Sequence, residues 1–206
     1  MKTALIAGAS GLTGSYLLQL ALESKTYDEV KILVRKPLDI DHPSLQQIVY
    51  DYENPDPEGI QADHVYCCLG TTMKKAGSRE AFKKVDYGYP MQIAKMAQRN
   101  GAEKFALVSA IGANTKSMFF YNRVKGQLEE ALKEIPYKAT YILHPSMLIG
   151  PRKEKRFGEE IGKNLMKAFR IFLPPNMKSI HASQVAACML DYMNGKESGV
   201  HTIPSG

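Results

Sequence analysis

Short apolar runs alternate along the chain with longer segments in which apolar residues recur at helical spacing. The runs predict strands over residues 3–7, 30–34, 47–50, 64–69, 103–109, 138–144 and 200–203. Helical spacing predicts helices after Gly14 and over residues 86–100, 117–132, 159–169 and 183–193. Strands that alternate with helices favour an α/β fold with a doubly wound, mainly parallel sheet and helices on both faces. We expect one domain over residues 1–206, with its substrate-side elements mainly within 145–182.

The first predicted strand runs directly into a glycine-rich turn, Gly8-Ala9-Ser10-Gly11-Leu12-Thr13-Gly14. Gly8 permits the tight turn, Gly11 lets backbone N–H groups approach a pyrophosphate, and Gly14 lets the next helix pack closely on the strand. The N-terminus of that helix offers partial positive charge to phosphates. The spacing is GxxGxxG, unlike the GxGxxG of most dehydrogenases. Because a strand precedes the turn and a helix follows it, the stretch predicts a Rossmann-type nucleotide-binding unit.

Two cations after the second strand bear on the choice of nucleotide. Arg35, followed by Lys36, lies 21 residues after Gly14, where NAD-preferring units carry an acidic residue that bonds the ribose hydroxyls. Cations at this place favour a 2′-phosphate, so NADP(H) is expected in preference to NAD(H). The alternative is that both side chains simply face solvent before Pro37.

The candidate chemistry follows the fifth strand, which ends at Ser109. Tyr121 comes twelve residues later and Lys125 four residues after that, in a segment of helical spacing. An i, i+4 pair shares one helix face, and a neighbouring ammonium favours tyrosinate over a phenol whose unperturbed pKa is about 10. Tyr121 is therefore a candidate proton donor supported by Lys125, and Ser109 a candidate hydrogen-bonding group for a substrate carbonyl.

The segment between the fourth strand and the next helix is less regular. Gly70 lets the backbone lie against a dinucleotide, and Thr71 and Thr72 offer hydroxyl contacts. Residues 73–84 are basic and are expected to form a loop. Asp86 is the expected N-cap of the helix that follows, and that helix is expected to stop at residues 100–101.

Composition excludes several classes of protein. The chain has 206 residues, of which 44% are hydrophobic and 23% charged, as in ordinary soluble domains. No apolar run approaches the roughly 20 residues of a membrane span. The three cysteines lack zinc-site and C-x-x-C spacing, so no metal site is predicted and the thiols are expected to be reduced. A strand that begins at Thr3 argues against a signal peptide, and a cytoplasmic location is expected.

The net charge of +6 is unevenly placed. Residues 151–170 hold seven basic and three acidic side chains, which is +4 of that total. Either an acidic ligand uses this segment or it is a solvated helix face. No basic stripe interleaved with aromatic residues appears, so nucleic-acid binding is not expected. The apolar stretch 171–175 either covers the substrate pocket or forms a subunit contact, which leaves a monomer and a homodimer both open.

From end to end the chain resembles the short-chain dehydrogenase/reductase superfamily, on its GxxGxxG turn, strand-end serine and Tyr-x-x-x-Lys. More narrowly, it is similar to the Tat-interacting-protein group of atypical members. The motifs that carry this similarity are Cys67-Cys68-Leu69-Gly70-Thr71-Thr72, Lys75-Ala76-Gly77, Val85-Asp86 and Tyr121-x-x-Val124-Lys125-Gly126. His144 departs from the arginine that extended members usually carry, and the region after the sixth strand is short; both departures leave the substrate pocket undefined.

The resemblance implies a set of roles. It implies that Ser109, Tyr121 and Lys125 form a catalytic triad, with Lys125 also holding the nicotinamide ribose. The implied cofactor contacts are Gly8, Ser10, Gly11, Leu12 and Thr13 for the phosphates, Arg35 for the 2′-phosphate, Asp51 for adenine, Leu69 and Gly70 for the adenosine ribose, and Pro145 and Met147 for the nicotinamide.

Two functions fit these residues. The first is an NADP(H)-dependent oxidoreductase that reduces a small carbonyl or quinone substrate. The second is an NADP(H)-binding regulatory or scaffold protein that presents a surface to a protein partner and has little or no turnover. The complete Ser-Tyr-Lys set favours the enzyme.

Overall fold

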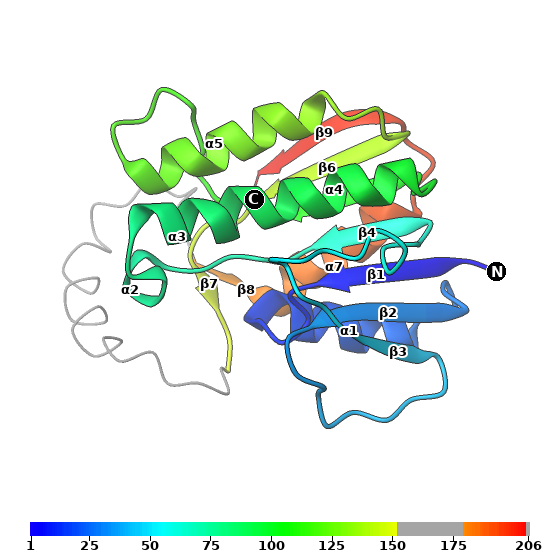
Figure 1. The fold of residues 1–206 in the computed structure, drawn as a ribbon. Coiled ribbons are helices and arrows are strands. Elements are labelled where there is room, and N and C mark those ends of the chain that lie inside the picture. Colours follow the sequence, from blue (N-terminus) through cyan, green and yellow to red (C-terminus); the bar gives the residue numbers. More distant parts are fainter. Residues whose placement is uncertain (152–178, 205–206) are drawn as a thin grey trace.

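A parallel sheet of seven strands, in the order β3-β2-β1-β4-β5-β6-β9, forms the centre of the molecule (Figure 1). The computed structural model describes residues 1–151 and 179–204. The strands are β1 (Thr3–Ala7), β2 (Glu29–Val34), β3 (Leu45–Val49), β4 (His64–Cys67), β5 (Lys104–Val108), β6 (Ala139–His144) and β9 (Gly199–Pro204). The predicted doubly wound Rossmann-type α/β fold is confirmed, because the chain builds outward from β1 in both directions.

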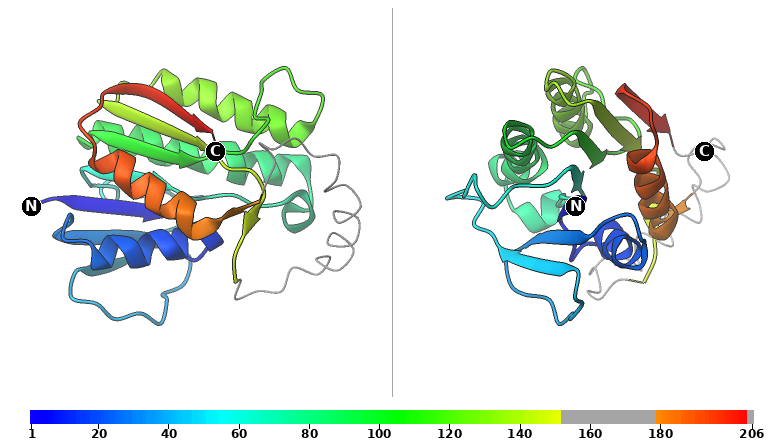
Figure 2. Two further views of the ribbon diagram at one scale, coloured as in Figure 1. Left: turned by 180° about the vertical axis from the view of Figure 1, so that it is seen from behind. Right: turned by 90° about the vertical axis from the view of Figure 1, so that its right-hand side faces the viewer.

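Helices cover both faces of this sheet (Figures 1 and 2). One face carries α1 (Leu12–Glu23) and α7 (Ala182–Asn194), and the other carries α4 (Tyr89–Arg99) and α5 (Phe120–Lys133). Three short elements precede α4, namely α2 (Met73–Ala76), α3 (Arg79–Lys83) and the π-helical turn η1 (Lys84–Gly88). A small two-stranded ladder pairs β7 (Leu148–Ile149) with β8 (Ile180–His181).

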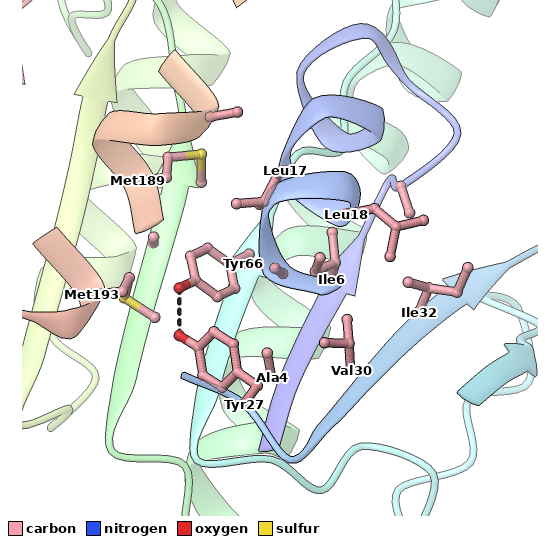
Figure 3. Packing of buried hydrophobic residues seen from close by; sticks show 14 of the residues in the cluster. Ala4, Ile6, Leu17, Leu18, Tyr27, Val30, Ile32, Tyr66, Met189 and Met193 are labelled. Atoms are coloured by element: carbon pink, nitrogen blue, oxygen red, sulfur yellow. Dashed lines mark hydrogen bonds between the residues drawn. The ribbon is translucent and has the colours of Figure 1, made fainter. Parts of the chain in front are cut away.

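The two faces have separate cores because side chains alternate along each strand. Under α1 and α7, Leu17 and Met189 pack against the sheet near Tyr66 (Figure 3). Under α4 and α5, Ile93 and Leu128 pack on the other side. Strands covered on both faces must be apolar throughout, and this explains why their sequences read as continuous hydrophobic runs.

Two local predictions were wrong. Residues 73–84 are helical rather than looped, because Thr72 and Ser78 cap α2 and α3 and the side chain of Phe82 is fully buried. Asp86 is not an N-cap: it lies inside η1, which continues into α4, and its carboxylate is buried. The ladder of β7 and β8 was not predicted, because two-residue strands carry no periodic signal.

Several predictions concern residues 152–178, which lie outside the described part of the chain. They are the helix over 159–169, the apolar stretch 171–175, all but the first residue of the basic segment 151–170, and the larger part of the substrate-side region 145–182. Among residues 1–151 and 179–204, no helix is both long and apolar enough to cross a membrane.

The glycine turn is packed so closely that side chains are excluded from it. Gly8 has φ +85°, and a Cβ there would lie 2.7 Å from the carbonyl of Cys68. A Cβ on Gly14 would lie 2.2 Å from the carbonyl oxygen of Gly8. The first turn of α1 therefore rests directly on the loop that leaves β1, beside the end of β4.

We expect Gly14→Ala to destabilise the fold, because the methyl group has to displace backbone rather than a flexible side chain. Overpacking of this kind costs roughly 1–3 kcal/mol, measured as the free energy of unfolding in urea. Gly59→Ala is the matched control, since its nearest neighbour would be 3.5 Å away, at the Asp56 carboxylate. Equal stability of the two variants would contradict the close packing.

A buried hydrogen-bond chain lies beneath α7. The hydroxyl of Tyr27 is 2.8 Å from Nδ1 of His64 and 2.6 Å from the hydroxyl of Tyr66 (Figure 3). Burial, together with the positive charges of Lys2 and Lys104, lowers the pKa of His64 to about 3. His64 is therefore neutral in the fold, whereas an unfolded chain protonates it near pH 6.5.

This difference predicts a loss of stability on acidification. The unfolded state binds the extra proton between pH 6.5 and about 3, so stability is full above this window and falls as the pH drops through it. Between pH 7 and pH 5 the loss due to His64 is about 2 kcal/mol. The amide oxygen of Gln in His64→Gln can still accept a hydrogen bond from Tyr27. In this variant the free energy of unfolding in urea should not show the loss due to His64 between pH 7 and pH 5. An unchanged pH dependence in that variant would be evidence against the depressed pKa.

Candidate active site

The carboxyl ends of the parallel strands bring the predicted site residues to one edge of the sheet (Figure 1). Gly8 follows β1, Arg35 and Lys36 follow β2, Leu69, Gly70 and Thr71 follow β4, Ser109 follows β5, and Pro145 and Met147 follow β6. The strand order reverses between β1 and β4, because β2 and β3 lie on one side of β1 and β4, β5, β6 and β9 on the other. Crevices at such switch points are where open α/β sheets bind ligands.

The glycine turn leaves the N-terminus of α1 open to an anion. Gly11 donates its N–H to the carbonyl of Gly8 at 2.9 Å and then precedes the first helical residue, Leu12. No described side chain caps this helix, and its first turn holds no acidic residue. Ser10 is exposed and Thr13 is buried. Free N–H groups at a helix N-terminus suit phosphate oxygens, so the turn fits the pyrophosphate of a dinucleotide.

The part of the edge that follows β2 and β3 carries exposed charge and an aromatic cluster. Arg35 and Lys36 are both exposed. Asp51 accepts hydrogen bonds from the side chain of Asn54 and the backbone of Glu53, each at 2.9 Å, and these bonds lower its pKa. Its carboxylate thus stabilises its own loop, while the neighbouring ring of Tyr52 packs between two other tyrosine rings. Sequence reasoning did not single out this cluster.

A buried ion pair stands at the centre of the site. The ammonium of Lys125 lies 2.9 Å from Oδ1 of Asp86, and both side chains are almost fully buried. The other oxygen of Asp86 accepts the backbone N–H of Thr71 at 2.8 Å, while Oδ1 accepts no hydrogen bond from the described residues. Burial alone lowers the pKa of Lys125, but the attraction of Asp86 and Tyr121 outweighs it and the pKa is raised. Lys125 is therefore held charged behind Gly70.

Tyr121 stands one helical turn before Lys125, near the start of α5. Its ring lies 5.6 Å from that of Phe82, and the residue is 37% exposed. The hydroxyl accepts and donates no hydrogen bond among the residues that the structure describes. The structure thus places a solvent-accessible phenol beside a buried cation, which is the arrangement a proton donor needs.

Ser109 has a partner that the sequence did not reveal. Its hydroxyl donates a short hydrogen bond to Oε1 of Glu129, which is also 2.8 Å from Nε2 of His144. Ser109 and Glu129 are buried, and His144 is partly buried. Glu129 lies four residues after Lys125 on α5, so Tyr121, Lys125 and Glu129 form one stripe at i, i+4 and i+8. This spacing is the sequence feature from which Glu129 could have been identified.

The remaining candidates line the far end of the edge. Pro145 is buried, and its carbonyl accepts the N–H of Ile111 at 3.1 Å. Met147 is 42% exposed and directly precedes β7. Among the described residues no group of three or more histidine, cysteine or acidic side chains is placed to hold a metal ion.

The ion pair predicts an asymmetry between two substitutions. Asp86→Ala leaves a buried ammonium unpaired and should cost about 3–5 kcal/mol of unfolding free energy. Asp86→Asn keeps the side-chain volume and one carbonyl oxygen, which can accept from either Thr71 or Lys125, and should cost less.

Urea unfolding of the two variants tests this ordering. Glu103→Ala serves as the control, because the pair that Glu103 forms with Lys138 is exposed and should contribute little. If Asp86→Ala were no more damaging than Glu103→Ala, the pair would not be buried as described.

Comparisons with known proteins agree with this geometry. A family model described as NAD(P)H-binding matches residues 8–194. Protein FMP52, mitochondrial, of Candida albicans is 33% identical over 196 residues, which cover 91% of this chain and 86% of that protein. Protein HTATIP2 of Rattus norvegicus is 32% identical over 199 residues, which cover 94% of this chain and 80% of that protein.

Solved structures show the same fold at low sequence identity. MoeE5 in complex with UDP-glucose and NAD superposes with a TM-score of 0.74 and 15% identity, and the match covers 99% of this chain and 76% of that one. UDP-glucuronic acid 4-epimerase from Bacillus cereus, in complex with NAD, superposes with a TM-score of 0.72 and 16% identity. The match covers 99% of this chain and 77% of that one.

The relatives correct the expected location. Several related FMP52 proteins are named mitochondrial, which conflicts with a purely cytoplasmic placement. Free cysteines indicate only that the surroundings are reducing. They do not distinguish the cytosol from another reducing compartment. The expected cytoplasmic location was wrong.

Proposed function

Because the chain belongs to the NAD(P)H-binding family, as an atypical short-chain dehydrogenase/reductase related to HTATIP2 and FMP52, we propose that it is an NADP(H)-dependent oxidoreductase. Its substrate is a small carbonyl or quinone compound. The observation that carries the proposal is the exposed phenol of Tyr121 one turn from the buried, charged Lys125, at the edge where the glycine turn lies. Residues 1–206 act as one domain, with the substrate side mainly within 145–182.

The residues present fit a dinucleotide. The turn at Gly8 and Gly14 has no room for a Cβ, and the N–H groups at the start of α1 are uncapped. Gly11, Leu12 and Thr13 would hold the pyrophosphate, and Leu69 and Gly70 would lie along the adenosine ribose. When bound, the cofactor supplies a hydride to the carbonyl carbon of the substrate.

Side chains of the protein supply the proton that the substrate oxygen gains. Tyr121 gives its phenolic proton to the carbonyl oxygen as negative charge develops there. Lys125, kept charged by Asp86, stabilises the resulting tyrosinate and would also hold the nicotinamide ribose. Ser109 orients the substrate oxygen. Pro145 and Met147 would flank the nicotinamide.

The preference for NADP(H) rests on Arg35 and Lys36. Both are exposed after β2, and neither is accompanied by an acidic residue at the position that bonds ribose hydroxyls in NAD-preferring units. A guanidinium can bind a 2′-phosphate with two parallel hydrogen bonds.

We expect Arg35→Ala to weaken NADPH binding by about tenfold to a hundredfold, the value of a lost charge-assisted hydrogen bond of roughly 1.5–3 kcal/mol. NADH binding should hardly change, because NADH lacks the 2′-phosphate. Thermal shift titrations with both nucleotides measure this, with the exposed Lys25→Ala as the control. If wild-type protein shifted equally with NADH and NADPH, the NADP(H) assignment would be wrong.

Replacing Tyr121 by Phe should lower turnover about 10²- to 10⁴-fold, because the proton donor is removed while the ring remains. Oxidation of NADPH with 9,10-phenanthrenequinone as the probe substrate measures it, and Tyr192→Phe on α7 is the matched control. Unchanged turnover in Tyr121→Phe would exclude this role.

The regulatory alternative shares the cofactor and differs in turnover. A protein that binds NADPH tightly yet oxidises it with none of a panel of carbonyls and quinones would favour that alternative over the enzyme.

A further inference from the structure

Three side chains from different elements meet at one hydrogen-bonded cluster, and the proposed catalytic serine is one of them. Ser109 follows β5, His144 ends β6, and Glu129 lies on α5. The parallel register pairs Val108 with Leu143, and the N–H of Ser109 donates to the carbonyl of Leu143 at 2.9 Å. Ser109 and His144 are therefore adjacent by strand pairing, and α5 sets Glu129 against both.

Both contacts reach the same oxygen of Glu129. Oε1 accepts the hydroxyl of Ser109 and lies 2.8 Å from Nε2 of His144. The Glu129 side chain is 7% exposed, so water contributes little to its hydrogen bonding. An ionised carboxylate has no hydrogen to donate. If Glu129 is ionised, both neighbours must donate to it, and these two donors compensate the burial of its charge.

This arrangement decides which way the serine hydroxyl points. A serine has one hydrogen and two lone pairs. When its hydrogen is held by Glu129, Ser109 offers only lone pairs to the active site. It can then accept a hydrogen bond from a hydroxyl group, but it cannot donate one to a carbonyl oxygen.

We propose that Glu129 is a positioning residue which, as a carboxylate supported by His144, holds the hydrogen of Ser109 and makes Ser109 an acceptor for the hydroxyl form of the substrate. The inference rests on the proposed oxidoreductase function and changes one part of it: Ser109 orients the oxygen of the hydroxyl form of the substrate and does not donate to the carbonyl oxygen. The recognised form is an alcohol or hydroquinone, whose hydroxyl hydrogen Ser109 binds. Tyr121 is then the donor to the oxygen of the carbonyl form.

The protonation states can be measured without turnover. In protein labelled with ¹³C at the glutamate carboxyl and ¹⁵N in histidine, Glu129 should show the chemical shift of an ionised carboxylate at pH 7. Nε2 of His144 should carry a proton. Glu129→Gln and His144→Gln assign the two signals. Ser109→Ala removes one donor and should move the Glu129 carboxyl signal. The proposal would be overturned if Glu129 were protonated at pH 7, or if its carboxyl chemical shift did not change in Ser109→Ala.

A kinetic comparison tests the positioning role in the same proteins. With phenanthrenequinone, Glu129→Leu should lower kcat about tenfold or more while KM stays within about threefold, because Ser109 binds the hydroxyl group that forms during turnover and not the quinone itself. Glu129→Gln keeps a polar partner for Ser109 and should recover part of kcat. The thermal shift with NADPH should equal that of wild type in both variants, because neither changes a proposed cofactor contact.

The outcomes separate the two proposals. Loss of the NADPH shift in wild-type protein would count against the proposed function and leave the NMR result to decide the role of Glu129. A normal NADPH shift with an unchanged kcat in Glu129→Leu would refute the positioning role alone. If wild-type protein does not turn over the quinone, the ionisation of Glu129 and its response to Ser109→Ala decide the inference.

Discussion

The contact between the backbone of Gly8 and that of Cys68 is the constraint on which the rest of the structure depends. It exists because β1 and β4 are neighbours at the switch point and because Gly8, at φ +85°, has no Cβ. Gly14 then rests on the carbonyl of Gly8, which sets the position of α1. Two close backbone approaches therefore shape the turn proposed to hold the phosphates and join the two halves of the sheet.

Around this frame the site is made from polar and charged groups that are buried but paired. Lys125 is held by Asp86, and Glu129 is held by Ser109 and His144. Burying a charge without a partner is costly, so each pair is linked to the packing of the elements that carry it. Because α5 carries Lys125 and Glu129 on one stripe, the position of this helix controls both pairs. The apolar core beneath α5, around Leu128 and Leu132, is what keeps that position.

Local chemistry explains which parts of the fold were predictable. The strands could be predicted because a sheet covered on both faces leaves continuous apolar runs such as residues 3–7. The glycine turn could be predicted because its three glycines are spaced as a strand-turn-helix connection of a Rossmann unit requires. The segment 73–84 was misjudged because its lysines suggested a solvated loop. The helix caps at Thr72 and Ser78 and the burial of Phe82 outweigh that impression. Asp86 was predicted to be an N-cap because aspartate is common at that position. It is instead the buried ion-pair partner of Lys125, which lies 39 positions further along the chain.

The sequence by itself determined the α/β class, the order of the strands along the chain, the nucleotide-binding turn and the residues that can bear chemistry, because these depend on local spacing and residue type. The partners of those residues were decided by tertiary structure. The pairing of β4 with β1 and of β5 with β6, and the packing of α5 on the sheet, bring Asp86 to Lys125 and His144 to Glu129. A contact between distant residues depends on how whole elements pack, and no pattern within one element records it.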